Sequence, residues 1–272
     1  VSDYLDGLPS GGVPGSASEA CVLGFDEARA SAFAKGVAGD FNPLHDVGNK
    51  RFCVPGDLLF AALLQHYGLH EHVSVGFAGM LGAHSRLSLP ADTGNGQRLH
   101  LTDERGRDVL GYYASGERLH DAVFIERLTE EYVSFSGRTF PAILMPLMER
   151  AGVMVNPERP LIIYKDMAIR LDTAALAASL AERPAGQGDP GDPDDPDDPG
   201  GTLTLDAAGH AFSADGRKGA ASVRFTIRRG GATLGEGEKN FVLTGLRDYD
   251  AGAVATLLER HEERRAAYPG RM

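Results

Sequence analysis

The chain has 272 residues, of which 42% are hydrophobic, and this length and composition suffice for one large folded domain or two ordinary ones. A mostly disordered chain is therefore excluded. The formal net charge is −11, but six of the aspartates gather in one tract, so the rest of the chain is only mildly acidic. Because the chain has no basic cluster and no tryptophan, the sequence predicts no nucleic-acid partner.

The N-terminal region and the cysteines narrow the class of protein further. No run approaches the roughly 18 apolar residues that a membrane-spanning helix needs, and residues 1–20 are acidic and rich in Gly, Ser and Pro. We expect a cytoplasmic protein without a membrane partner, in which residues 1–20 form a flexible segment. Cys21 and Cys53 are too few for a disulfide framework or a cysteine-based zinc site.

The first half of the chain predicts two helices around a short polar segment. Residues 25–38 place apolar side chains at helical spacing, and the segment from Gly39 to His45 follows them. Residues 55–67 predict a second helix that is apolar on nearly every face, so other structure must cover it. Three strand-like segments come next, at 85–89, 98–101 and 108–117.

The second half repeats this order. A predicted helix over 121–135 runs into Gly137 to Pro141, which has the Gly-x-x-x-Pro spacing of the first half, and a short apolar helix over 146–151 follows. Four strand-like segments come next, at 161–171, 202–205, 220–228 and 236–243. We therefore predict two α+β units, residues 21–120 and 121–249, each with a curved antiparallel sheet around a helix.

Two segments stand outside these predicted cores. Residues 184–201 are dense in Pro, Asp and Gly, and we expect a solvated acidic loop there, because the spacing departs from that of a calcium-binding loop. Residues 250–272 predict a charged C-terminal helix with a narrow apolar stripe, which we expect to pack on the outside.

The segment from Gly39 to His45 carries the main candidate site. It joins the carboxylate of Asp40, the amide of Asn42 and the imidazole of His45 across a stretch that Pro43 makes rigid. We expect Asp40 and His45 to face one small volume, where one group removes a proton and the other handles a second proton. A structural alternative stays open, because Asp and Asn also cap helices and brace turns.

A second candidate feature is the start of the buried helix at Gly56 and Asp57. The amino end of a helix offers free N–H groups and positive potential, which suits an oxyanion hole for a thioester carbonyl. A carboxylate at Asp57 is unfavourable there if it points at the oxyanion, and alternatively it serves the helix dipole. The other histidines complete no known zinc pattern, so the sequence predicts no metal.

The string from Gly39 to His45 resembles the G-D-x-N-P-x-H motif of MaoC-like, R-specific enoyl-CoA hydratases, which have the hotdog fold. The internal repeat resembles their double-hotdog members. Residues 33–46, 51–60 and 237–250 look still closer to an uncharacterised bacterial hotdog family. The resemblance implies an α+β double hotdog in which Asp40 and His45 are catalytic and Asn42, Gly39 and Pro43 support them.

The same resemblance implies that Gly56, with Asp57 beside it, faces the thioester oxygen. It also implies a hydratase/dehydratase that adds or removes water on an acyl-CoA or acyl-carrier-protein substrate, without a cofactor. Arg138 stands where the first half has Asp40, and no histidine follows shortly after Pro141, so only the first half is expected to be catalytic.

Two other functions stay open at this stage. The first is a hotdog thioesterase, in which Asp40 directs water at the carbonyl carbon. The second is a non-catalytic protein that binds an acyl thioester or a regulatory partner. Whether two chains associate as a homodimer is also left open.

Overall fold

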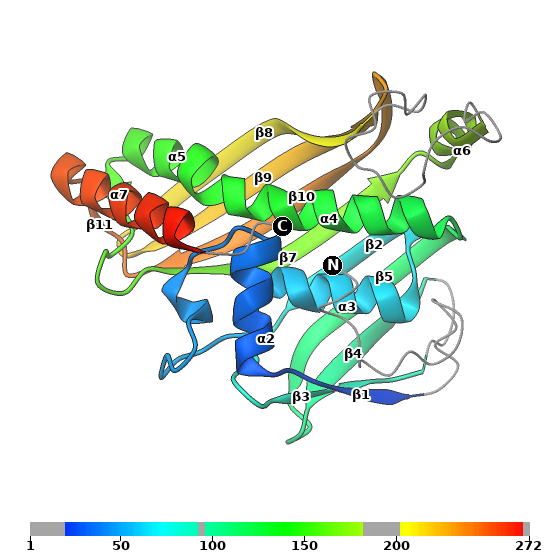
Figure 1. Ribbon diagram of the computed structural model, residues 1–272, viewed down its shortest axis with the longest axis horizontal. Helices are drawn as coiled ribbons and strands as arrows, with labels where there is room; N and C mark the ends of the chain where they lie inside the picture. Colours follow the sequence, from blue (N-terminus) through cyan, green and yellow to red (C-terminus); the bar gives the residue numbers. More distant parts are fainter. Residues whose placement is uncertain (1–19, 92–95, 182–201, 269–272) are drawn as a thin grey trace.

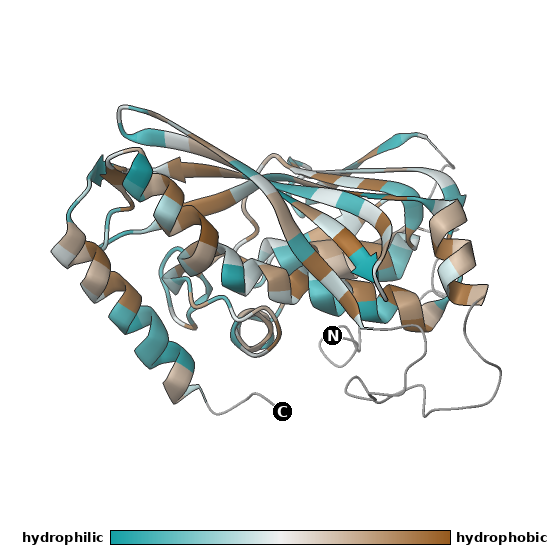
Figure 2. Ribbon diagram, turned by 90° about the horizontal axis from the view of Figure 1, so that it is seen from above, coloured by the Kyte–Doolittle hydropathy of each residue, from teal (hydrophilic) through white to brown (hydrophobic). Residues whose placement is uncertain are grey.

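The computed structural model describes residues 20–91, 96–181 and 202–268. Within these ranges, one large antiparallel sheet is covered on one face by helices (Figures 1 and 2). Its nine strands follow the order β1-β3-β4-β5-β2-β7-β10-β9-β8. They are β1 (Cys21–Gly24), β2 (His70–Phe77), β3 (Arg86–Leu89), β4 (Arg98–Asp103), β5 (Asp108–Arg118), β7 (Leu161–Leu171), β8 (Leu203–Asp215), β9 (Lys218–Arg229) and β10 (Ala232–Thr244). A small separate sheet pairs β6 (Val153–Met154) with β11 (Arg247–Asp248).

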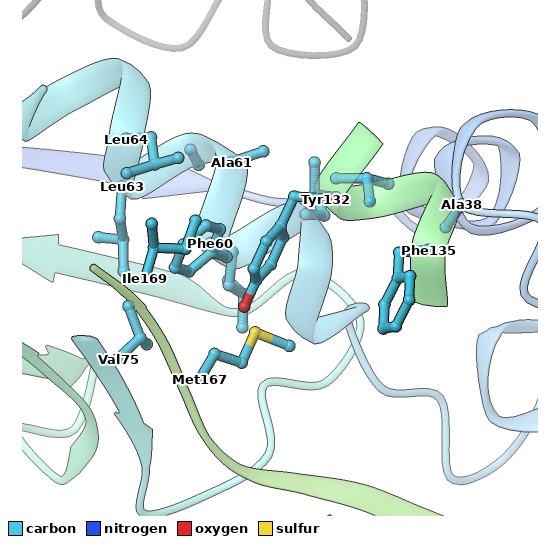
Figure 3. Close-up of a cluster of buried hydrophobic side chains, with 14 of the residues drawn as sticks. Ala38, Phe60, Ala61, Leu63, Leu64, Val75, Tyr132, Phe135, Met167 and Ile169 are labelled. Atoms are coloured by element: carbon cyan, nitrogen blue, oxygen red, sulfur yellow. The ribbon is translucent and has the colours of Figure 1, made fainter. Parts of the chain in front are cut away.

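Helices α3 (Gly56–Tyr67) and α4 (Ala122–Thr139) lie against the same face of the sheet (Figure 1). Nine of the twelve residues of α3 are buried, as expected for a helix that is apolar all round. The rings of Phe60 and Tyr132 stack with centroids 4.3 Å apart, which joins the two helices in the core (Figure 3). The other helices are α2 (Glu27–Ala32), the π-helix η1 (Phe33–Val37), the 3-10 helix η2 (Pro43–His45), the π-helix η3 (Phe140–Leu144), α5 (Met145–Arg150), α6 (Thr173–Ala181) and α7 (Ala251–Ala267).

The two halves of the chain share the sheet. Strands β1 to β5 come from the first half and β7 to β10 from the second, and β2 pairs with β7 at the boundary. The register there is antiparallel, with Val73 opposite Ile169 and Val75 opposite Met167, and all four of these side chains are buried. The prediction of an α+β chain with a large antiparallel sheet is confirmed.

The Gly-x-x-x-Pro spacing does not mark equivalent structures in the two halves. In the first half the helix ends and Gly39 adopts a φ of 65°. In the second half, the residues from Gly137 to Pro141 lie inside a helical run that continues through η3 into α5. Pro141 is accommodated because it stands at the start of a π-helical stretch, where its missing N–H disturbs the bonding least. The helix predicted over 146–151 occurs as α5, with its ends shifted by one residue, but no break separates it from the preceding helix.

Other predicted elements occur with shifted ends or were missed. The helix predicted over 25–38 is α2 followed by η1, and the strand predicted over 202–205 extends through β8 to Asp215. Strands β1 and β2, helix α6 and the small sheet were not predicted. In β2, polar residues from His70 to His72 precede the apolar alternation and obscure it.

Three predictions concern the ends and the acidic tract. The segment 1–20, apart from Ala20, and the loop 184–201 lie outside the described residues. The C-terminal helix is α7, of which only Val254 is buried among its described residues. None of the helices in the described ranges is both long and apolar enough to cross a bilayer.

Candidate active site

The backbone from Gly39 to His45 is fixed by local bonds. Gly39 takes a left-handed conformation, which glycine adopts without strain, and this turns the chain out of η1. The side-chain oxygen of Asn42 accepts a hydrogen bond from the N–H of Leu44 at 3.1 Å and so caps η2. Pro43 occupies the start of the same short helix, where its fixed φ is favourable. The two candidate catalytic side chains therefore project from a rigid segment.

The structure brings Asp40 and His45 together. Oδ2 of Asp40 lies 3.4 Å from Nε2 of His45. Nδ1 of His45 lies 2.7 Å from the carbonyl oxygen of Cys53, and since a carbonyl only accepts, Nδ1 carries a proton. Oδ1 of Asp40 accepts a hydrogen bond from the N–H of Asn42 at 2.8 Å. In each side chain, one polar atom is hydrogen-bonded to the backbone, and the other polar atom faces the partner residue.

The environment shifts the pKa values of the pair in opposite directions. Burial alone raises the pKa of Asp40 and lowers the pKa of His45. The hydrogen bond and charge of the partner, together with backbone hydrogen bonds, outweigh burial in both cases. The pKa of Asp40 lies below its ordinary 3.8 and the pKa of His45 above its ordinary 6.5. Between those limits the pair is a carboxylate beside an imidazolium.

Asp40 and His45 stand in the wall of a pocket of about 500 Å³. Both halves of the chain line it, and most of the lining is apolar. A concave apolar site with a few polar groups in its wall is typical of a small-molecule binding site. The apolar side chains include Leu59, Phe77, Met80, Leu81, Phe140, Leu144, Ile162, Ile163, Phe241 and Leu257.

Helix α7 covers one side of this pocket. The ring of His261 meets the ring of Phe41 edge to face, with centroids 5.7 Å apart, and His261 also lines the pocket. Arg264 forms an ion pair with Asp46, which directly follows the candidate pair in sequence. Burial lowers the pKa of His261. The C-terminal helix therefore closes the pocket beside Asp40 and is part of the candidate site.

Gly56 lines the pocket at the first turn of α3. The residue before it, Pro55, supplies no side-chain cap, so the first-turn N–H groups of α3 have no capping side chain. A Cβ at position 56 would lie 2.6 Å from the ring of Tyr164, so only glycine fits this close approach. The position predicted for the oxyanion-binding N–H thus opens onto the pocket.

Asp57 does not line the pocket, and its carboxylate lies behind the pocket wall. Oδ1 accepts hydrogen bonds from Nζ of Lys239 at 3.0 Å and from Oγ of Ser136 at 2.9 Å, and Oδ2 accepts one from the hydroxyl of Tyr164 at 2.9 Å. Lys239 is fully buried and also donates to the carbonyl of Tyr132 at 2.6 Å. We call Asp57, Lys239, Ser136 and Tyr164 the Asp57 cluster. Because Lys239 balances the charge of Asp57, the carboxylate is compensated where it lies.

Lys239, Ser136 and Tyr164 were not predicted from the sequence. For Lys239 a signal was present, because two-residue alternation along β10 puts it on the same face as the buried Phe241. A lysine on a buried face needs a carboxylate partner, which points to the acidic residue on the apolar α3. Ser136 and Tyr164 carried no such signal, since both residue types are common in helices and strands.

The second half of the chain lines part of the pocket, but it has no carboxylate–imidazole pair equivalent to Asp40 and His45 at the corresponding position. Arg138, at the position that corresponds to Asp40, is exposed and lies 4.0 Å from Glu131. Its neighbours Gly137 and Thr139 line the pocket, whereas Arg138 does not. A Cβ at Gly137 would lie 2.1 Å from the carbonyl oxygen of Ala38, so α4 packs directly on the segment that leads to Asp40.

The potential metal ligands and the two thiols of the described residues complete the survey of reactive side chains. Within residues 20–91, 96–181 and 202–268, no group of three or more His, Cys, Asp and Glu side chains is placed to hold a metal ion. Cys21 and Cys53 are free thiols. Burial raises the pKa of the Cys53 thiol to about 11, so this pocket-lining group stays protonated at neutral pH.

Three solved structures that resemble the chain come from different organisms. They are the full-length peroxisomal multifunctional enzyme type 2 from Drosophila melanogaster, the dehydratase domain of PpsC from Mycobacterium tuberculosis in complex with C12:1-CoA, and a MaoC-like dehydratase from Phytophthora capsici. The identities are 13%, 12% and 13%, with TM-scores of 0.40, 0.40 and 0.34. The matches cover 83%, 82% and 90% of this chain and 48%, 93% and 99% of the others, so this chain spans about half of the Drosophila enzyme.

Sequence comparison identifies a family. No curated protein matches the sequence. The family described as "Protein of unknown function (DUF3581)" matches residues 17–183 and 200–252, which together make up most of the chain. The chain therefore belongs to the DUF3581 family.

Proposed function

We propose that this chain is a MaoC-like hydratase/dehydratase, which adds or removes water at the double bond of an enoyl thioester carried by CoA or by an acyl-carrier protein. One observation carries the proposal. A carboxylate and an imidazole lie 3.4 Å apart in the wall of an apolar pocket of about 500 Å³. A water molecule bound at that place meets two proton-exchanging groups beside the space for an acyl chain.

The directions of the two pKa shifts suit a mechanism in which Asp40 acts as the base and His45 as the acid. In the hydration direction, Asp40 takes a proton from water while the water oxygen bonds to the β-carbon of the substrate. Protonated His45 gives its Nε2 proton to the α-carbon. The proton on Asp40 then passes to Nε2 of His45, which lies 3.4 Å away, and restores the starting pair. No redox or metal chemistry is required, because the reaction moves only protons and one water molecule.

Gly56 supports this reaction from the other side of the substrate. The uncapped first turn of α3 presents N–H groups and the positive end of the helix dipole to the pocket. A thioester carbonyl placed there is polarised, and the negative charge that develops on its oxygen is stabilised. This role needs the backbone N–H of Gly56 and no contribution from the side chain of Asp57.

The strand order supports a double-hotdog fold as part of the same proposal. Residues 21–120 form a five-stranded half-sheet with α3 against it, and residues 121–249 form a four-stranded half-sheet with α4 against it. The halves join through β2 and β7 into one continuous sheet. In this arrangement the first unit supplies the reacting pair, and the degenerate second unit supplies much of the acyl pocket.

The proposal is tested by mixing the purified protein with crotonyl-CoA and with a medium-chain trans-2-enoyl-CoA. Enoyl absorbance and free thiol are followed together in wild type, Asp40→Asn and His45→Ala. We expect loss of enoyl absorbance without release of thiol in wild type, and no loss above background in the two variants. Release of thiol instead identifies a thioesterase, and flat traces for folded wild type overturn an enoyl-CoA hydratase.

The chain offers a matched control for these variants. His100 and Asp108 form a second His–Asp pair at 3.5 Å, but their side chains are 64% and 60% exposed, and neither lines the pocket. His100→Ala and Asp108→Asn repeat the same chemical changes outside the pocket. Both are expected to keep wild-type activity, and a comparable loss in them contradicts the assignment of Asp40 and His45.

A further inference from the structure

Tyr164 connects the Asp57 cluster to the pocket. Of the four cluster members, Ser136 and Tyr164 line the pocket, while Asp57 and Lys239 lie behind them. Tyr164 comes from β7, so the second half of the chain places it at the start of α3 in the first half. The side chain of Tyr164 thus lines the pocket and also bonds to the buried carboxylate.

The ring of Tyr164 is held in place on three sides. Its Cδ2 atom lies 2.6 Å from the point where a Cβ of Gly56 would be, so the ring packs on the backbone of the first turn of α3. The rings of Phe77 and Phe241 lie 6.0 and 4.7 Å away between centroids. A ring fixed in this way has little freedom to move, and it holds its hydroxyl at the carboxylate of Asp57 in the first turn of α3.

The hydrogen bonds of the cluster show where each proton lies. Lys239 donates to Oγ of Ser136, so the hydroxyl of Ser136 donates onward to Oδ1 of Asp57 at 2.9 Å. The hydroxyl of Tyr164 lies 2.9 Å from Oδ2 of Asp57 and 2.9 Å from Oγ of Ser136, and either oxygen can accept its hydrogen bond. If the O–H of Tyr164 turns toward the pocket, Asp57 still keeps the donors from Lys239 and Ser136 on Oδ1.

We propose that Tyr164 supplies the second hydrogen-bond donor for the thioester oxygen, opposite the N–H of Gly56, and that Asp57 and Lys239 hold its hydroxyl ready for this contact. The inference rests on the proposed function and adds a catalytic residue from the second half of the chain. Two donors from different elements define one position for the carbonyl, and thereby fix the double bond relative to Asp40 and His45.

The protonation of Tyr164 agrees with a role as donor. Burial and the charge of Asp57 raise its pKa well above 10, and the charge of Asp40 contributes in the same direction. The hydroxyl therefore stays protonated throughout the physiological range. Lys239, 3.0 Å from Asp57, reduces the repulsion that this carboxylate exerts on negative charge nearby.

In the proposed hydration step, Tyr164 neither gains nor loses a proton. As the water oxygen bonds to the β-carbon, the electron pair of the double bond moves through the α-carbon onto the thioester oxygen. The O–H of Tyr164 and the N–H of Gly56 stabilise that negative charge but keep their protons. When the α-carbon receives its proton from His45, the carbonyl reforms and the hydroxyl returns to Oδ2 of Asp57.

The test compares Tyr164→Phe with wild type, and uses Tyr113→Phe as control, because Tyr113 packs against Arg98 and does not line the pocket. Hydration of crotonyl-CoA gives kcat and KM. Binding of cinnamoyl-CoA gives a second readout, since the absorbance of this conjugated thioester moves to longer wavelength when its carbonyl accepts strong hydrogen bonds. We expect Tyr164→Phe to lose about 10²-fold in kcat with KM little changed, and to lose most of the spectral shift.

The outcomes separate this inference from the function on which it rests. If wild type hydrates crotonyl-CoA and Tyr164→Phe matches it in kcat and in spectral shift, the inference is overturned and the proposed function stands. If Tyr164→Phe loses activity and thermal stability but keeps the spectral shift, Tyr164 is only a structural brace, and the inference is again overturned. If folded wild type neither binds nor hydrates either thioester, both fail.

A second variant covers the case in which Tyr164→Phe does not fold. Replacement of Tyr164 by 3-fluorotyrosine keeps the ring and the hydroxyl but makes the hydroxyl a stronger acid and a stronger donor. We expect the bound cinnamoyl-CoA to absorb at longer wavelength in this variant than in wild type. An unchanged spectrum contradicts a hydrogen bond from Tyr164 to the thioester oxygen.

Discussion

Two carboxylate–cation pairs flank the first turn of α3, and they are built for different tasks. Asp40 and His45 come from one short segment and lie 3.4 Å apart, with side chains 30% and 10% exposed. Asp57 and Lys239 come from opposite halves of the chain and lie 3.0 Å apart, with side chains 3% and 0% exposed. The two distances are similar, so distance alone does not distinguish a reacting pair from a structural one.

The difference lies in how the remaining hydrogen-bonding capacity is used. The ammonium of Lys239 donates to Asp57, to Ser136 and to the carbonyl of Tyr132, which accounts for its three protons. By contrast, Nε2 of His45 and Oδ2 of Asp40 face each other and the pocket. The first arrangement holds the fold together, and the second leaves groups available to a ligand.

The largest effect is expected when the buried pair is broken. Lys239→Ala leaves the carboxylate of Asp57 buried without its cation, and we expect the free energy of unfolding to fall by about 3–5 kcal/mol. Urea unfolding followed by circular dichroism measures this loss. In the double variant Lys239→Met with Asp57→Leu no charge stays buried, so most of the stability should return. A single variant that unfolds like wild type contradicts the structural role.

The opposite pattern is expected for the pocket pair. Asp40→Asn and His45→Ala should each lower the hydration rate by about 10²–10⁴-fold, because each removes a proton-transfer group. The same urea measurement should show a change in unfolding free energy within about 1 kcal/mol, as for other partly exposed pairs. If Asp40→Asn instead unfolds the protein, the pair is structural and the contrast with Lys239 disappears.

A smaller loss of stability and activity is expected when the Asn42 side-chain cap, which fixes the segment between Asp40 and His45, is removed. Asn42→Ala removes the side-chain oxygen that accepts the N–H of Leu44, which should cost about 1 kcal/mol of unfolding free energy. The backbone bond from residue 42 to Asp40 remains, so hydration activity should fall less than in Asp40→Asn. Asn42→Asp, which keeps an acceptor, serves as the control. Equal stability of the alanine variant and wild type argues against the cap.

The smallest effect concerns pH. Because the folded pKa of His45 is above 6.5, its contribution to stability is complete below that value and is lost as pH rises through the folded pKa. Because the folded pKa of Asp40 is below 3.8, its contribution is present above 3.8 and is lost as pH falls through the folded pKa. Wild type and Asp40→Asn should therefore differ most in stability between these two limits.

An NMR titration of the His45 ring checks the same shift directly. The pKa of His45 should lie above 6.5 in wild type and should fall in Asp40→Asn, because burial then acts with less opposition. A His45 pKa that is unaffected by the loss of Asp40 means that the two groups do not interact in solution.

The parts of the site that are formed by residues close together in sequence could be predicted. The contacts between residues far apart in sequence could not. Asp40, Asn42 and His45 lie within six residues, and a glycine, a proline and an Asx cap fix their geometry. The partner of Asp57 is 182 positions away, so no local pattern identifies it. The large antiparallel sheet followed from alternation in most strands, whereas β2 was missed because polar residues from His70 to His72 mask its apolar face.

The Gly-x-x-x-Pro spacing shows a different limit of sequence reasoning. Pro141 predicts a helix end by its chemistry alone, yet the chain passes through it as a π-helix. Pro141 falls at the start of η3, where its missing N–H is tolerated, and nearby Gly137 lets α4 approach the carbonyl of Ala38. The same spacing therefore accompanies a helix end in the first half and a continuous helical run in the second.

The span of the Asp57 cluster has a consequence for how the protein forms. Because 182 positions separate Asp57 from Lys239, the cation reaches its carboxylate only after these 182 residues have been added to the growing chain. Until then the first turn of α3 carries an uncompensated charge and cannot pack fully. The pocket wall that Tyr164 completes therefore needs both halves of this chain, and neither half forms the pocket by itself.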